Sequence, residues 1–168
     1  AAIIIGQADA NVTINPYSGA YDTAAHNLTG SVTGVDAGSV ALGSSLTFGS
    51  SFINAPGGTG TWNFEGGTNY LDESGTAAII IGQADANVTI NPYSGTYDAA
   101  AHNLTGSVTG VDAGSAAAGS SLTFGSSFTD APGGTGTWNF EGGTNYLDES
   151  GTAAVTIAQA SQTITFGA

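Results

Sequence analysis

The chain contains no lysine, arginine, cysteine or methionine in its 168 residues. Without cysteine it can form neither disulfides nor thiolate metal sites. Its 13 acidic residues meet no lysine or arginine and give a formal net charge of −13. Because there is no basic patch for phosphate, electrostatics exclude nucleic acid as a partner, and anionic membrane surfaces repel the chain.

Long apolar runs are also missing, so we expect no membrane insertion of this segment. Charged residues make up only 8% of the chain, whereas glycine occurs 27 times. This composition, rich also in threonine, serine, alanine and asparagine, is typical of secreted bacterial surface repeats rather than of cytosolic enzymes. An apolar content of 40% in regular alternation argues against disorder.

The most informative feature that is present is a repeat. Residues 1–76 recur as residues 77–152, and a third copy begins at Ala153 and stops at Ala168. Near-identical tandem units build rods and arrays, and a spacer or a multivalent surface gains more from copies than an enzyme does. We therefore expect a non-enzymatic protein without a cofactor. The two copies differ at six positions: Ala20/Thr96, Thr23/Ala99, Val40/Ala116, Leu42/Ala118, Ile53/Thr129 and Asn54/Asp130.

Strand signals dominate each repeat. Apolar residues alternate with polar ones in short segments that are bounded by Gly, Pro and Asn clusters, and no long stretch keeps a helical period. The sequence therefore predicts an all-β fold of tandem small domains, β-grasp-like or immunoglobulin-like, with 76 residues per repeat and little or no helix. The predicted core is Val12, Ile14, Leu28, Val32, Leu46, Phe48, Trp62, Phe64, Ile79 and Ile81, with the equivalent residues 76 positions later.

The substitutions between copies and the repeat junctions refine this prediction. Two large apolar residues of the segment 36–44 are alanine in the second copy, which indicates a surface loop or edge. The run AAIIIGQADANVTI across the junction contains no proline and one glycine, so we expect no flexible linker but a semi-rigid string of domains. The predicted boundaries are 1–7, the closing strand of a truncated upstream repeat; 8–83 and 84–159, two full domains; and 160–168, the opening strand of a third.

Candidate metal ligands lie after a Gly-Gly-Thr-Asn-Tyr turn in each copy. Asp72-Glu73 and Asp148-Glu149 could bind Ca²⁺ together with carbonyl oxygens of that turn. The alternative is that these adjacent acids are simply solvated. His26 has no cysteine or histidine near it in sequence and no aspartate at a recognised catalytic spacing, so it is interpreted as a satisfied surface or half-buried residue, as is His102.

Aromatic residues could form a face that stacks on sugars. The candidates are Trp62, Tyr17, Tyr21 and Tyr70. Trp62 alternates with Phe64, which predicts a place in the core, so the tyrosines are the better candidates for exposure.

The order of several motifs resembles the MBG-type repeats of large bacterial cell-surface proteins. The resemblance rests on ADANVTINPYSGAYDTAAHNLTGSVTGVDAGS, LTFGSSF, APGGTGTWNFEGGTNYLDESGTAAI and ASQTITFGA, and it covers essentially the whole chain. It implies a small β domain strung in tandem as the stalk of an adhesin or another secreted giant protein, and it implies no catalytic residue. Where such repeats commonly have an Asn-Lys-Ala junction, this chain has Gly6-Gln7-Ala8.

Together these observations predict a non-enzymatic structural repeat, located outside the cell at a bacterial surface or in a secreted fibre. Its partners would be adjacent repeats of the same chain. Two alternatives stay open. The repeats could be a multivalent adhesin module that binds glycans or proteins, with avidity from each copy. They could also be subunits of a self-assembling filament that exchange terminal strands with other copies.

Overall fold

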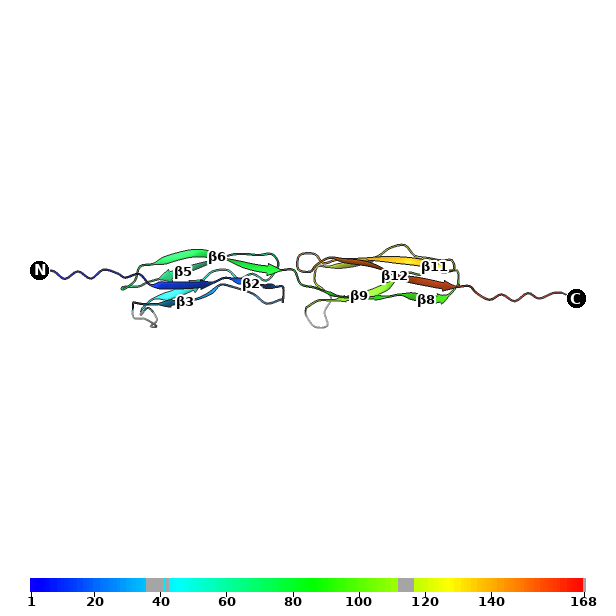
Figure 1. The fold of residues 1–168 in the computed structure, drawn as a ribbon, viewed down its shortest axis with the longest axis horizontal. Coiled ribbons are helices and arrows are strands. Elements are labelled where there is room, and N and C mark those ends of the chain that lie inside the picture. The colour runs from blue at the N-terminus through cyan, green and yellow to red at the C-terminus, as the bar shows by residue number, and fades with distance from the viewer. Residues whose placement is uncertain (36–40, 42, 112–116, 168) are drawn as a thin grey trace. The chain divides into compact units, whose positions relative to one another are not determined.

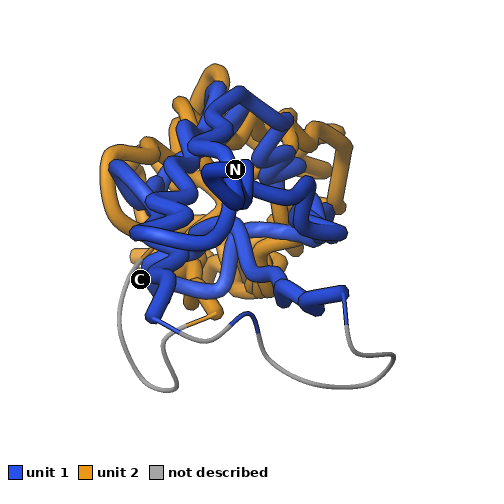
Figure 2. Tube along the Cα trace, turned by 90° about the vertical axis from the view of Figure 1, so that its left-hand side faces the viewer, with its two compact units in different colours: residues 1–83 blue, residues 84–168 orange. Residues whose placement is uncertain are grey.

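The computed structural model describes residues 1–35, 41, 43–111 and 117–167. These residues form twelve strands and no helix, which confirms the predicted all-β fold (Figure 1). Accordingly, this part of the chain contains no helix that could cross a membrane. The chain divides into two compact units, Ala1–Gln83 and Ala84–Ala168, which Figure 2 shows in blue and orange.

Each unit contains six strands in the same order. Unit 1 contains β1 (Asn11–Asn15), β2 (Tyr17–Ala20), β3 (Thr29–Thr33), β4 (Ser45–Phe48), β5 (Gly57–Glu65) and β6 (Glu73–Gly82). Unit 2 contains β7 (Asn87–Asn91), β8 (Tyr93–Thr96), β9 (Thr105–Thr109), β10 (Ser121–Phe124), β11 (Gly133–Glu141) and β12 (Glu149–Ala158).

The strands of unit 1 form a two-stranded sheet, β1-β3, and a four-stranded sheet in the order β2-β6-β5-β4. All pairs are antiparallel except β2 with β6, which run parallel. The chain passes from the first sheet to the second at Pro16, where the missing N–H ends one ladder. Unit 2 repeats both sheets as β7-β9 and β10-β11-β12-β8. Two packed sheets, with no helix among the described residues, fit the immunoglobulin-like alternative better than the β-grasp-like one, because a β-grasp domain packs a helix on its sheet.

The core of unit 1 lies between these two sheets. Val32 from β3 packs with Phe64 from β5 and with Tyr70 and Ala41 from the connecting segments. At the other end of the four-stranded sheet, the strict alternation of β6 buries Ile79 and Ile81 at 1% exposure each. Burial is therefore confirmed for five predicted core residues: Leu28, Val32, Phe64, Ile79 and Ile81.

The other five predicted core residues are not fully buried, although Val12, Leu46 and Trp62 pack against the core. Val12, Ile14, Leu46, Phe48 and Trp62 point inward but are only half-buried. For Leu46, Phe48 and Trp62, which lie on the four-stranded sheet, the reason is the size of the layers, since a sheet of two strands cannot cover a sheet of four. Side chains near the uncovered margin keep part of their surface in water.

The expected exposure of two tyrosines was also wrong. Tyr21 and Tyr70 are each 7% exposed. The hydroxyl oxygen of Tyr70 accepts a hydrogen bond from the Val35 N–H at 3.4 Å, so the phenol can be buried without losing its polar contact.

The segment 36–44 lies mostly outside the described residues, including Val40 and Leu42. Within it, Ala41 is 1% exposed and belongs to the core, so the prediction of a surface segment was wrong for this residue. Ala118, the equivalent of Leu42 in unit 2, is exposed.

The segments predicted as terminal strands, 1–7 and 160–168, contain no strand in the part that the structure describes. Ile3, Ile4 and Ile5 are about 90% exposed, although the same Ile-Ile-Ile sequence in β6 buries Ile79 and Ile81. The contrast has a simple cause. A strand needs a neighbouring backbone to complete its hydrogen bonds, and β6 has β5 and β2 on its two sides.

Candidate functional site

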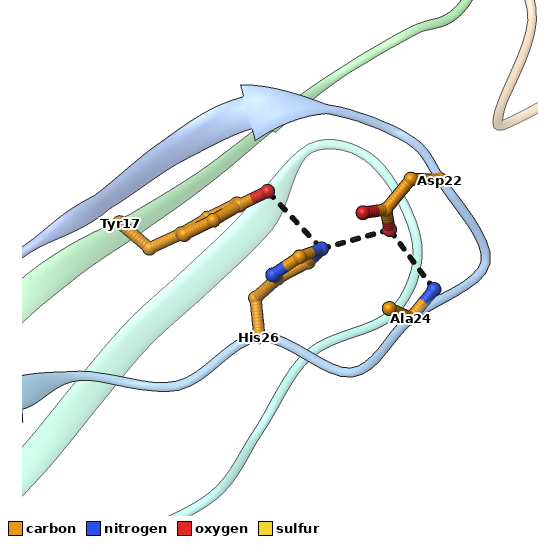
Figure 3. A network of polar contacts seen from close by, with 4 residues as sticks. All are labelled: Tyr17, Asp22, Ala24 and His26. Atoms are coloured by element: carbon orange, nitrogen blue, oxygen red, sulfur yellow. Dashed lines mark hydrogen bonds and ion pairs between the residues drawn. The ribbon is translucent and has the colours of Figure 1, made fainter.

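A polar cluster of each unit lies in the connection between its second and third strands. In unit 1 the imidazole Nε2 of His26 lies 2.8 Å from Asp22 Oδ1 and 3.1 Å from the Tyr17 hydroxyl (Figure 3). The same carboxylate oxygen accepts a hydrogen bond from the Ala24 N–H at 2.9 Å. Because an ionised carboxylate can only accept hydrogen bonds, Nε2 must be protonated and donate a hydrogen bond to Asp22.

The imidazole is held from a second direction by an aromatic ring. Tyr17, the first residue of β2, stacks on His26 with 3.8 Å between ring centroids and 13° between ring planes. The His26 side chain is 15% exposed, whereas Asp22 is 51% exposed. The backbone of His26 also pairs with Phe52, so the cluster ties the β2–β3 connection to the β4–β5 connection.

Unit 2 reproduces this arrangement. His102 Nε2 lies 2.9 Å from Asp98 Oδ1 and 3.1 Å from the Tyr93 hydroxyl, and the rings of Tyr93 and His102 stack at 3.9 Å. The residue after each aspartate, Thr23 in one unit and Ala99 in the other, has a positive φ of 70° or 67°. Such a backbone is unfavourable for non-glycine residues, and the aspartate that caps it supplies the compensating hydrogen bonds.

The cluster is best described as a structural clip. His26 Nε2, the Tyr17 hydroxyl, Asp22 Oδ1 and the Ala24 N–H all form hydrogen bonds within the cluster. The tyrosine ring covers the face of the imidazole. The sequence predicted a satisfied surface or half-buried His26, and the structure shows the half-buried alternative. The sequence prediction missed the aspartate partner, for which the available signal was an aspartate followed by an Asx-turn sequence and a histidine four residues later.

We expect the clip to lose strength in acid. Two hydrogen bonds to the Asp22 carboxylate hold its pKa below the usual 3.8. The one from His26 has the larger effect, and the one from the Ala24 N–H follows. A carboxylate with a depressed pKa in the folded state stabilises the protein at higher pH. Its contribution is fully present above about pH 3.8 and is lost as the pH falls through the lower value of the folded state. A ¹³C NMR titration of the Asp22 carboxyl should give a midpoint below 3.8.

The two copies provide the control for this titration. In unit 2 the hydrogen bond from the Ala100 N–H is the largest cause of the lowered pKa of Asp98, ahead of His102. His26→Phe should raise the midpoint of Asp22, and His102→Phe should raise that of Asp98, because each substitution removes the hydrogen bond from the imidazole. An Asp22 midpoint at or above 3.8, or a midpoint that neither substitution changes, would contradict the geometry.

The candidate calcium ligands occupy a turn in which one carboxylate already has a structural role. Asp72 Oδ1 accepts a hydrogen bond from the Gly66 N–H at 2.8 Å, and Asp148 Oδ1 accepts one from the Gly142 N–H at 2.7 Å. Glu73 is half-buried as the first residue of β6, as Glu149 is in β12. Within the described residues, no three His, Cys, Asp or Glu side chains gather as a group that could hold a metal ion.

Asp72 could serve only as a cap, defined here as the acceptor for the Gly66 N–H, or it could also bind calcium. Melting experiments on Asp72 variants decide between these two roles. Asp72→Ala should cost about 1 kcal/mol by leaving the Gly66 N–H without its acceptor. Asp72→Asn keeps an acceptor oxygen and should cost less. If the cap is the whole role, calcium chloride stabilises the chain no more than sodium chloride of equal ionic strength. A calcium-specific rise that Asp72→Asn abolishes would instead establish a site, by mass action.

The aromatic candidates do not form one exposed face. Tyr21 and Tyr70 are buried, Trp62 is half-buried and Tyr17 stacks on His26. The structure therefore assigns all four side chains to packing inside unit 1.

Three comparisons with known proteins complete the description of this site. No protein family, no curated protein and no solved structure matches the chain.

Proposed function

We propose that this chain is part of a non-enzymatic, extracellular stalk or fibre, built from tandem 76-residue β-sandwich repeats of the MBG type. The observation that carries the proposal is the connection between repeats. β6, the last strand of unit 1, ends at Gly82, and Ala84 already pairs with Tyr146 inside unit 2. A single residue, Gln83, separates these two hydrogen-bonded segments. A connection this short suits a string of domains better than it suits freely linked binding modules.

The composition supports the same proposal. Each repeat folds from its own small core without disulfides, so length can grow by duplication of one unit. With 13 acidic residues and no lysine or arginine, neighbouring stalks repel one another at short range and stay hydrated. The same charge keeps the fibre from nucleic acid and from anionic membrane surfaces.

Pulling single molecules of the full chain tests the stalk. A stalk should show two similar unfolding steps, each of which releases roughly 20–25 nm of chain, as expected for a repeat of this length. The rival functions predict other results with the same protein. Saturable binding to a glycan array or to a host protein would favour the adhesin module. Oligomers that grow with concentration in analytical ultracentrifugation would favour the filament. Either result would overturn the proposal.

A further inference from the structure

A Gln-Ala dipeptide recurs three times, at intervals of 76 residues: Gln7-Ala8, Gln83-Ala84 and Gln159-Ala160. In unit 1 the loop between β5 and β6 holds the first of them. The Gln7 side-chain amide donates to the Gly67 carbonyl at 3.0 Å. The Ala8 N–H donates to the Asn69 carbonyl at 2.8 Å, and the Ala8 carbonyl accepts from the Leu71 N–H at 3.0 Å.

Unit 2 holds the alanine of the second dipeptide in the same way. The Ala84 N–H donates to the Asn145 carbonyl at 2.9 Å, and the Ala84 carbonyl accepts from the Leu147 N–H at 3.0 Å. Both loops have the sequence Gly-Gly-Thr-Asn-Tyr-Leu. This loop is therefore a receptor for the Gln-Ala dipeptide at the start of its own repeat, and it binds mostly backbone groups.

The third dipeptide has the same sequence in a different setting. Gln159 and Ala160 are exposed, and no hydrogen bond of either residue is found in the described part of the chain. They line an open hollow of about 470 Å³ together with Tyr97, Ala131, Ser161 and Gln162. Tyr97 is 42% exposed there. This end of unit 2 thus offers backbone donors and acceptors beside an uncovered aromatic ring.

We infer that Gln159, Ala160 and Tyr97 form one half of a repeat-to-repeat docking surface, and that its occupant is the Gly-Gly-Thr-Asn-Tyr-Leu loop of a further repeat in the same chain. The loop supplies the two carbonyls and the N–H that complete Gln159-Ala160, as the loop at Gly67 does for Gln7-Ala8. The loop at Asn145 supplies the same backbone carbonyl and N–H to Ala84. Its arrival covers the hollow above Tyr97. The surface needs no ion pair, which fits a chain without lysine or arginine.

The inference rests on the proposed tandem array, and its test is separate. A three-repeat chain is made by replacing residues 160–168 with a copy of Ala84–Gln159, and it is compared with the 168-residue chain. Two measurements report docking: amide hydrogen exchange of the alanine after Gln159, and nitration of Tyr97 by tetranitromethane. We expect the exchange to slow by at least tenfold and the nitration of Tyr97 to slow several-fold. Tyr93, stacked on His102 away from the hollow, should keep its nitration rate.

A variant of the three-repeat chain tests the contacts themselves. Gln159→Ala removes the side-chain donor that is equivalent to Gln7 Nε2. It should speed the exchange of the following amide by roughly two- to tenfold, the equivalent of one hydrogen bond. Unchanged exchange and nitration in the three-repeat chain, with all three repeats folded by NMR, would overturn the inference.

The source of the loop is also decided by experiment. If Tyr97 of the 168-residue chain becomes protected as its concentration rises, the loop comes from another molecule and the assignment to the same chain is wrong. The results of the pulling and binding experiments, which test the stalk, do not depend on the exchange and nitration results, which test the docking surface. A chain that binds a glycan, and yet protects the alanine after Gln159, would contradict the stalk and leave the docking surface in place.

Discussion

Phe64→Ala should strongly destabilise unit 1 and leave the stability of unit 2 unchanged. Phe64 lies on β5 with no exposed surface, and it contacts the core residues that come from both sheets. Removal of a buried phenyl ring costs about 3–5 kcal/mol, because transfer energy is lost and a cavity remains. A unit of 76 residues has a stability of about 4–11 kcal/mol. The substitution therefore removes a large part of the stability of unit 1, or all of it.

Calorimetry of the variant should resolve two transitions, with that of unit 1 lowered by about 12–40 °C. Because Trp62 and Trp138 are the only tryptophans, each unit also carries its own fluorescence reporter. Phe140→Ala, at the equivalent site with no exposed surface, is the matched variant and should move the other transition. If either variant lowers both transitions equally, the units share one core, and the description of two separate cores is wrong.

The strands could be predicted from the sequence because their signal is local. The alternation of β6 places Ile79 and Ile81 on one side and Ile80, which is 54% exposed, on the other, as a period of two requires. Such a pattern identifies the inward face of each strand. It does not state how much of that face a second sheet will cover, and so Trp62 was expected to be buried but is only half-buried.

The burial of the tyrosines and the clip could not be predicted, because both depend on contacts across the fold. Tyr70 is buried against Val32 and Phe64, and its hydroxyl finds the Val35 N–H 35 residues away. His26 meets Asp22 through a turn with a left-handed residue at Thr23, which no helical or strand period describes. For the same reason Asp72 looked like a free ligand in the sequence, although a turn N–H already occupies it.

Gly57→Ala should destabilise unit 1 far more than the identical substitution at Gly43. Both glycines have a positive φ, +83° at Gly57 and +79° at Gly43, so both variants place alanine in a left-handed conformation at a cost of about 1–2 kcal/mol. Only Gly57 also lies against a neighbouring strand. A Cβ there would be 2.1 Å from the carbonyl oxygen of Ile79, whereas a Cβ at Gly43 would meet nothing within 4 Å.

Because the atom in the way is backbone, no side-chain rotation can relieve the contact. Either β5 or β6 must move, and overpacking of this kind costs about 1–3 kcal/mol more. We therefore expect Gly57→Ala to lower the free energy of unfolding of unit 1 by about 2–5 kcal/mol, against about 1–2 kcal/mol for Gly43→Ala. Urea titrations followed by Trp62 fluorescence measure both. Gly133→Ala, where the Cβ would be 2.0 Å from the Val155 carbonyl oxygen, should repeat the larger loss in unit 2. Equal losses at Gly57 and Gly43 would mean that the β5–β6 approach is looser than described, and that only the backbone conformation requires glycine.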